Sequence, residues 1–153
     1  MGDIVNSSPV YTHDESYGYG GYTGGGGATS YAGFVSDPNN KRPPMLYVGG
    51  NDGMLHALDA QTGEEVFSYV PGGSYDHLAE LTDPQYDHKY FVDGSATVSD
   101  VYLDTNGDGQ GDSWRRILVG TMGRGGQRVF ALDVTDPKNF SADDVLWEYD
   151  SSN

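Results

Sequence analysis

The sequence predicts an all-β protein made of two four-stranded antiparallel blades of a partial β-propeller. Segments 46–70 and 117–149 share one order of features: an apolar run ending in Val-Gly, a glycine turn, a run ending in Ala-Leu-Asp, a polar turn and a last run with aromatic residues. Their Ala-Leu-Asp motifs lie 74 residues apart. The run 3–11 recurs loosely as 91–103, which adds a strand to each copy. A four-stranded unit present twice is typical of propeller blades.

Blade one is expected over about residues 3–71. Pro9 interrupts the first run and cannot donate a ladder hydrogen bond, so it indicates an edge position or a bulge. Asn51-Asp52-Gly53 is a hairpin signal between two apolar runs. The expected strands are 3–11, 45–48, 54–58 and 65–70.

A Tyr/Gly-rich segment interrupts this blade at residues 16–33. The stretch 17–27 is nearly all tyrosine and glycine, and so much glycine opposes a regular element because of its backbone entropy. We expect a mobile loop that is dispensable for folding. Two interpretations remain open: an adhesive surface of tyrosines, or a tolerated insertion.

Blade two is expected over about residues 90–150, after one or two helical turns at 75–81. Its predicted strands are 90–103, 116–120, 127–133 and 145–149, with a turn at Asp136-Pro137. Apolar residues of the central strands should pack blade against blade; they are Val48, Leu55, Leu58, Leu118, Val119, Phe130 and Leu132. Two blades leave two outer faces uncovered, which predicts self-association or marginal stability as a monomer.

The composition excludes several classes of function. The net charge is −15 with 8 Lys and Arg residues, which argues against nucleic acid, because a phosphate backbone is held mainly by these side chains. There is no cysteine to form a disulfide or a thiol nucleophile. No apolar run approaches the roughly 20 residues that span a bilayer. The first residues lack a basic region followed by an apolar stretch, so an export signal would have to lie outside this sequence.

The clearest chemical motif is the run from Asp104 to Asp112. Side chains that carry oxygen stand at its positions 1, 3, 5, 7 and 9, and glycine stands at position 6, as in calcium-binding loops. Position 12 is Arg115 where an EF-hand has glutamate, so the motif is not an EF-hand. We expect a shorter calcium loop; the alternative is a solvated hairpin. The candidate ligands are the side chains of Asp104, Asn106, Asp108 and Asp112 and the backbone carbonyl of Gln110.

Other polar motifs predict less chemistry. The histidines at 13, 56, 77 and 88 have no spacing typical of a metal site, and three of them adjoin an aspartate. Neighbouring side chains on a strand point apart, so no catalytic use is expected. The glycine run 120–126 superficially suggests a phosphate loop, but a strand pattern follows it where such a loop needs a helix.

Four motifs in order resemble the C-terminal propeller of the PilC/PilY family of type IV pilus tip proteins. They are Gly2 to Pro9, Tyr47 to Ala57, Tyr90 to Ser95 and Gly125 to Pro137. The resemblance implies a non-enzymatic module for pilus biogenesis and cell adhesion that is modulated by calcium. It also implies pilin partners, including minor pilins, contact with host or abiotic surfaces, and a place at the pilus tip, the cell surface, the outer membrane or the periplasm of a Gram-negative bacterium.

The pattern Asp52-Gly53, Ala57-Leu58-Asp59, Thr62-Gly63 is similar to the blade repeat of quinoprotein dehydrogenases. This makes the predicted fold a quinoprotein-like propeller, and Asp and Thr side chains of such turns can bond exposed backbone groups. One alternative function is therefore a fragment of a pyrroloquinoline-quinone-dependent dehydrogenase. Another is a carbohydrate-binding or structural module whose two-blade chains assemble into a ring.

Overall fold

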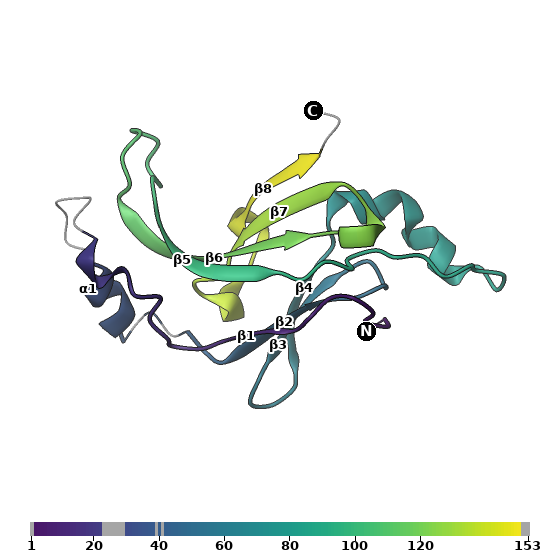
Figure 1. Cartoon of the computed structure of the whole chain (residues 1–153), viewed down its shortest axis with the longest axis horizontal. Helices are drawn as coiled ribbons and strands as arrows, with labels where there is room; N and C mark the ends of the chain where they lie inside the picture. The colour runs from purple at the N-terminus through teal and green to yellow at the C-terminus, as the bar shows by residue number, and fades with distance from the viewer. Residues whose placement is uncertain (1, 23–29, 39, 41, 151–153) are drawn as a thin grey trace.

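The computed structural model, which describes residues 2–22, 30–38, 40 and 42–150, consists of two four-stranded antiparallel sheets (Figure 1). The first sheet contains β1 (Val10–Thr12), β2 (Met45–Gly49), β3 (Leu55–Asp59) and β4 (Glu65–Tyr69), in that spatial order. The second contains β5 (Thr97–Leu103), β6 (Ser113–Thr121), β7 (Arg128–Asp133) and β8 (Val145–Asp150), also in sequence order. The predicted fold class, two four-stranded blades of a partial propeller, is confirmed.

The helices of the described residues are short and lie outside the sheets. They are the α-helix α1 (Tyr31–Ser36) and the 3-10 helices η1 (Tyr19–Gly21), η2 (Gly72–Thr82), η3 (Gly123–Gly125), η4 (Pro137–Asn139) and η5 (Ala142–Asp144). The expected helical turns at 75–81 are thus part of a longer 3-10 helix. None of the helices in the described ranges has the length and apolar character needed to cross a membrane.

The internal repeat extends to the irregularities of the sheets. In blade one the β3–β4 register shifts between Ala57 and Leu58, and in blade two the β7–β8 register shifts between Ala131 and Leu132. These are the matching positions of the two Ala-Leu-Asp motifs. Asp59 Oδ1 then accepts hydrogen bonds from the backbone of Gln61 and Thr62, and Asp133 Oδ1 accepts one from Thr135. The turn function expected of this motif is confirmed.

The hydrophobic core lies between the two sheets, which pack face to face. Its buried members are Met45, Tyr47, Leu55, Ala57, Val92, Ala96, Val98, Leu118, Phe130, Leu132 and Val134. Rings also meet across the interface: Phe67 stacks on Phe140 with centroids 3.9 Å apart, and Tyr69 lies 5.1 Å from Phe130. Because neither sheet can bury its apolar face alone, each blade stabilises the other.

Three of the residues expected between the blades lie elsewhere. Val48 pairs with His56, and Leu58 pairs with Leu46, on the face of blade one opposite Leu55. Val119 likewise alternates with Leu118 and lies on the outer face of blade two. The prediction was wrong for these three because successive side chains of a strand point to opposite faces.

The two first strands are shorter than predicted, and the chain before each of them joins the blades. Strand β1 begins after Pro9 and β5 begins at Thr97. Asn6 donates a side-chain hydrogen bond to Asp93 Oδ2 (2.7 Å), and Ser8 donates from its backbone to Ser95 Oγ (2.9 Å). These segments are the ones that recur in the sequence, so equivalent positions of the two blades bind one another.

Candidate calcium loop and its aromatic base

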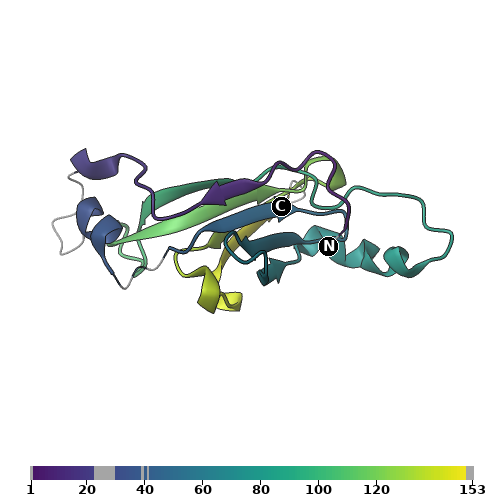
Figure 2. The ribbon, with the colours of Figure 1, turned by 90° about the horizontal axis from the view of Figure 1, so that it is seen from below.

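The predicted calcium loop is the connection between β5 and β6. Tyr102 pairs with Trp114 and Leu103 with Ser113, and the backbone of Asp112 donates to the carbonyl of Leu103 (2.7 Å), which closes the hairpin. The hairpin projects from the end of the molecule where α1 lies (Figures 1 and 2). Residues 104–110 are exposed, so the loop is open to solutes.

The Asp104 carboxylate is at the centre of this loop. Its Oδ1 accepts hydrogen bonds from the backbone of Gly107 (2.7 Å) and Asp108 (3.3 Å), and its Oδ2 accepts one from Gly109 (2.6 Å). Gly107 and Gly109 have φ of 81° and 84°, in the left-handed region that glycine adopts without a steric penalty. The glycines therefore let the backbone curl around the carboxylate of the first predicted ligand.

The side chains of the remaining predicted ligands also accept hydrogen bonds from within the loop. Asn106 Oδ1 accepts from the backbone of Asp108 (2.9 Å), and Asp108 Oδ1 accepts from the backbone of Gln110 (2.8 Å). Asp112 Oδ1 accepts from both the backbone and the hydroxyl of Thr105 (3.1 and 2.7 Å). The loop oxygens are thus ordered by amides of the loop itself. Across the residues that the structure describes, no three histidine or acidic side chains are gathered closely enough to hold a metal ion.

The electrostatics of the loop favour a charged Asp104. The backbone hydrogen bond from Gly109, followed by those from Gly107 and Asp108, lowers the pKa of Asp104 below its usual 3.8. Hydrogen bonds to a carboxylate favour its ionised form, because each donor places partial positive charge beside it. Asp104 is therefore an anion at neutral pH.

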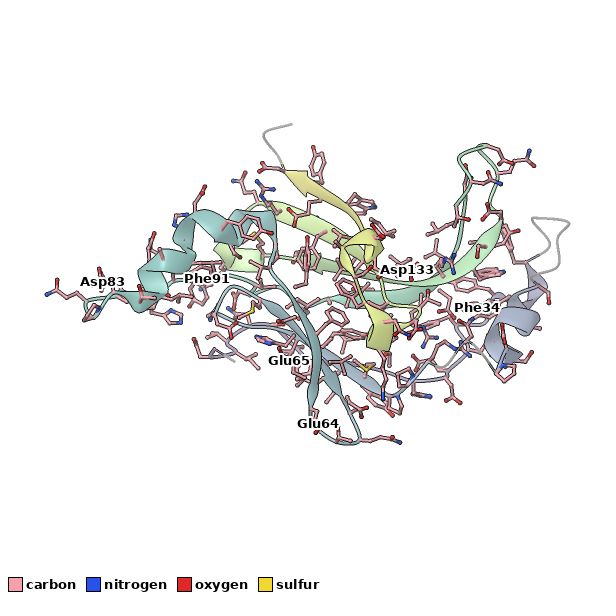
Figure 3. All side chains as sticks on the ribbon, turned by 180° about the vertical axis from the view of Figure 1, so that it is seen from behind. Phe34, Glu64, Glu65, Asp83, Phe91 and Asp133 are labelled. Carbon is pink, nitrogen blue, oxygen red and sulfur yellow. The ribbon has the colours of Figure 1, made fainter. Side chains whose placement is uncertain are left out.

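An aromatic cluster forms the base of the hairpin. Trp114 (5% exposed) lies 4.7 Å from the ring of Tyr31, 5.3 Å from that of Tyr102 and 5.7 Å from that of Tyr19, measured between centroids. Phe34, labelled in Figure 3, belongs to the same cluster. A Cβ at Gly111 would stand 2.4 Å from the Tyr102 ring, so the loop backbone rests directly on the cluster.

A buried ion pair continues this base into blade two. Arg116 Nε donates to Asp100 Oδ1 (2.9 Å), and the two side chains are 2% and 0% exposed. The Arg116 guanidinium also donates to the backbone carbonyls of His13 and Glu15, and it lies 5.1 Å from the centroid of the Tyr17 ring. Every charge-bearing atom of the pair thus has a partner, as a buried ion pair requires.

The aromatic cluster and the ion pair correct the interpretation of segment 16–33. Tyr17, Tyr19 and Tyr31 pack onto blade two, and Tyr31 is 3% exposed. The expectation of a mobile loop is therefore wrong for these residues, because Tyr19 and Tyr31 pack against Trp114 and Tyr17 lies against Arg116. That the segment is dispensable for folding stays a prediction. The glycine run of segment 16–33, residues 24–27, lies outside the described residues. Sequence reasoning missed both the aromatic cluster and the ion pair. The opposite charges of Asp100 and Arg116 within two apolar strands were a signal for the ion pair.

The histidines occupy separate places. His56 is buried on the outer face of blade one between Glu65 (2.8 Å) and Asp52 (3.0 Å), while Leu55 and Ala57 face the core. His13 does contact the adjacent aspartate: its Nδ1 lies 3.1 Å from Asp14 Oδ1. Glycine run 120–126 contains the end of β6 and η3 and leads into β7, so the expected strand follows it.

Two packed four-stranded blades, each with a bulge at an Ala-Leu-Asp motif, define this chain as part of a β-propeller. The model of the PilY1 β-propeller domain family matches residues 1–153. The chain belongs to this family.

Individual relatives agree with this assignment. A type IV pilus biogenesis factor PilY1 homolog of Xylella fastidiosa is 47% identical, over 99% of this chain and 12% of its own length. The type IV pilus biogenesis factor PilY1 of Pseudomonas aeruginosa strain UCBPP-PA14 is 40% identical, over 99% of this chain and 12% of its own length. The crystal structure of the Pseudomonas aeruginosa PilY1 C-terminal domain superposes with a TM-score of 0.58 at 36% identity, over 80% of this chain and 21% of that one. The chain thus spans about an eighth of the length of the Xylella and Pseudomonas pilus biogenesis factors.

Proposed function

We propose that this chain is a calcium-responsive, non-enzymatic propeller module of a protein that acts in type IV pilus biogenesis and adhesion. The observation that carries this proposal is the family match over the whole chain, together with relatives named as pilus biogenesis factors. These relatives are much longer than the chain, so the module acts as one part of a larger protein. Its place is the pilus tip, the cell surface, the outer membrane or the periplasm of a Gram-negative bacterium.

Calcium is the ligand that suits loop 104–112 best. The donor set is entirely oxygen, which is what Ca²⁺ selects, and it contains three carboxylates within nine residues. Nothing lies within 4 Å of a Cβ built at Gly107 or Gly109, so the loop has room to rearrange. The side chains of Asp104, Asn106, Asp108 and Asp112 and the carbonyl of Gln110 would hold the ion. Bound calcium would neutralise part of the carboxylate charge and stiffen the hairpin on its aromatic base.

The partners that we propose are pilins, host or abiotic surfaces, and the blades that complete the ring. Three apolar residues of blade two are exposed: Val101, Trp147 and Tyr149. They lie on the same outer face of the blade as Val119. An apolar surface of this kind favours association. The isolated chain therefore self-associates through this face, where a further blade would pack in the longer protein.

The non-enzymatic assignment is supported by the surroundings of Trp114. A quinone-dependent propeller stacks its cofactor on a tryptophan. Here Trp114 is covered by Tyr19, Tyr31 and Phe34, and the exposed Trp147 lies on the outer face of blade two. No observation favours the dehydrogenase over the pilus module.

The test uses the bacterium that carries the protein, with its gene deleted and then restored as wild type, Asp108→Ala or Asp87→Ala. Asp87 is an exposed aspartate outside the loop, so it controls for the lost charge. Deletion should reduce surface pili and twitching, and the wild type and Asp87→Ala should restore both in a calcium-dependent way. Asp108→Ala should lose the response to calcium. Normal pili in the deletion strain would overturn the pilus assignment, and a wild-type calcium response of Asp108→Ala would overturn the calcium assignment.

A further inference from the structure

A second site candidate lies at the other end of the molecule from the calcium loop, beside η2. A cavity of about 370 Å³ opens there between η2, the segment before β5 and the η3 turn. Phe91, labelled in Figure 3, marks its inner wall next to η2. The lining residues are Gly73, His77, His88, Lys89, Tyr90, Phe91, Arg124 and Gly125.

The lining gathers four basic side chains in a strongly negative chain. Two of the 8 Lys and Arg residues and two of the 4 histidines surround one cavity, although the net charge is −15. Two carboxylates face the same groups: Glu80 pairs with Lys89 and with His77 (2.7 Å), and Asp3 pairs with His88 (2.9 Å). The hydrogen bond from Lys89, followed by that from His77, lowers the pKa of Glu80.

Arg124 differs from these paired groups. Within the described part of the chain its guanidinium makes no ion pair, and it lies 5.6 Å from the centroid of the Tyr90 ring. A planar guanidinium that is stacked on an aromatic ring keeps its N–H donors available at its edge, where they match the two oxygens of a carboxylate or phosphate. Arg124 is therefore the group in this cavity that is ready to receive an anion.

The glycine turn at 123–125 brings Arg124 to this position. A Cβ at Gly125 would stand 1.7 Å from the carbonyl oxygen of Phe91, so only glycine lets the turn approach the cavity wall so closely. The backbone of Gly125 donates to the carbonyl of Met122 (2.8 Å), which fixes the turn. The turn thus places the Arg124 side chain at the cavity. In this respect it differs from a phosphate loop, which binds its ligand through backbone amides.

We propose that this cavity binds a small oxyanion, a carboxylate or phosphate group, with Arg124 as the anchor and Lys89 as the second donor. The Lys89 ammonium has three N–H donors, so its pair with Glu80 leaves others for the anion. Elsewhere the negative charge of the chain repels anions, so binding is local to this cluster. Two charge-assisted hydrogen bonds correspond to a Kd on the order of 1 mM. The site is separate from the calcium loop and is independent of the pilus assignment.

The experiment titrates phosphate, and in a second arm acetate, into the whole 153-residue chain labelled with ¹⁵N, with chloride adjusted to constant ionic strength. Saturable amide shifts are expected at Gly73, at 88–91 and at 123–125. Arg124→Gln should weaken binding at least tenfold, and Lys89→Gln should weaken it severalfold. Arg115→Gln is the control for loss of an arginine, because Arg115 lies outside the cavity and its Nε is 3.5 Å from Asp133.

The two arms separate the sources of the oxyanion. Tighter binding of acetate than of phosphate assigns the cavity to carboxylate ligands, and the reverse order assigns it to phosphate ligands. Spectra of each variant that match the wild type away from the cavity show that the fold is retained. The proposal is overturned if neither anion gives saturable shifts at the cavity, or if Arg115→Gln weakens binding as much as Arg124→Gln and Lys89→Gln do.

Discussion

Tyr31 donates its phenolic hydrogen bond to Asp100 Oδ2 over 2.8 Å, although 69 residues separate the two in sequence. The same carboxylate binds Arg116, and the Tyr31 ring packs on Trp114. The insertion within blade one is therefore anchored to the core side of blade two. This packing makes the base of the calcium loop an assembly of both blades, and its stability can be tested directly.

Replacing Arg116 with methionine should lower the free energy of unfolding by about 3–5 kcal/mol, because Asp100 would stay buried as an unpaired charge. The measurement is urea unfolding followed by circular dichroism. Arg115→Met is the control: its pair with Asp133 spans 3.5 Å at a half-exposed site, so the loss should stay within about 1 kcal/mol. Equal losses for the two variants would contradict the role given to the buried pair.

Truncating Phe34 to alanine should cost about 3–5 kcal/mol, because its side chain fills the aromatic cluster at 5% exposure. Tyr75→Ala, at 63% exposure, should change stability by about 0.5 kcal/mol or less. Thermal unfolding of both variants compares them under one condition. A Phe34→Ala protein as stable as the wild type would contradict the role given to the aromatic cluster.

Leu132→Asp should prevent folding, because Leu132 is 0% exposed between the blades and an aspartate there would be an unpaired buried charge. Leu146→Asp, at a position 40% exposed, should fold as the wild type does. The near-ultraviolet circular dichroism spectrum reports whether the packed core forms. A native spectrum for Leu132→Asp would mean that the blades do not depend on this contact.

The Asp104 carboxyl should titrate below pH 3.8, because loop amides stabilise its charged form. A lowered folded pKa means that this contribution to loop stability is fully present above pH 3.8 and is lost as the pH falls through the folded pKa. Carbon-detected magnetic resonance of the Asp104 carboxyl follows the titration. A midpoint at or above 3.8 would show that the amides of Gly107 and Gly109 do not hold the carboxylate.

Much of the fold follows from the sequence, because both copies of the Ala-Leu-Asp motif sit on short apolar runs between clear turns. The faces of the strands were harder to predict. Val48 and Leu58 are apolar like Leu55, yet they lie on the outer face, which depends on register and not on composition. The tyrosines of segment 16–33 were misinterpreted because the glycine content of the segment suggests a mobile loop. Trp114, which is remote in sequence, supplies the surface on which Tyr19 and Tyr31 pack.

The candidate calcium loop was predictable because all of its groups lie within nine consecutive residues. Its base was not, since Tyr31, Asp100 and Trp114 meet through tertiary packing alone. The cavity beside η2 has the same origin: Arg124 and Lys89 lie far apart in sequence and meet because the glycine turn packs on Phe91.

Calorimetric titration of calcium into the chain tests the central claim most directly. One saturable site with a Kd of roughly 10⁻⁴ to 10⁻³ M is expected, the range of weak extracellular calcium modules. Asp108→Ala should abolish the heat, while Asp87→Ala, which removes the same charge outside the loop, should leave the affinity unchanged. No saturable heat from the wild type, or equal weakening by the two variants, would contradict calcium binding at Asp104 to Asp112.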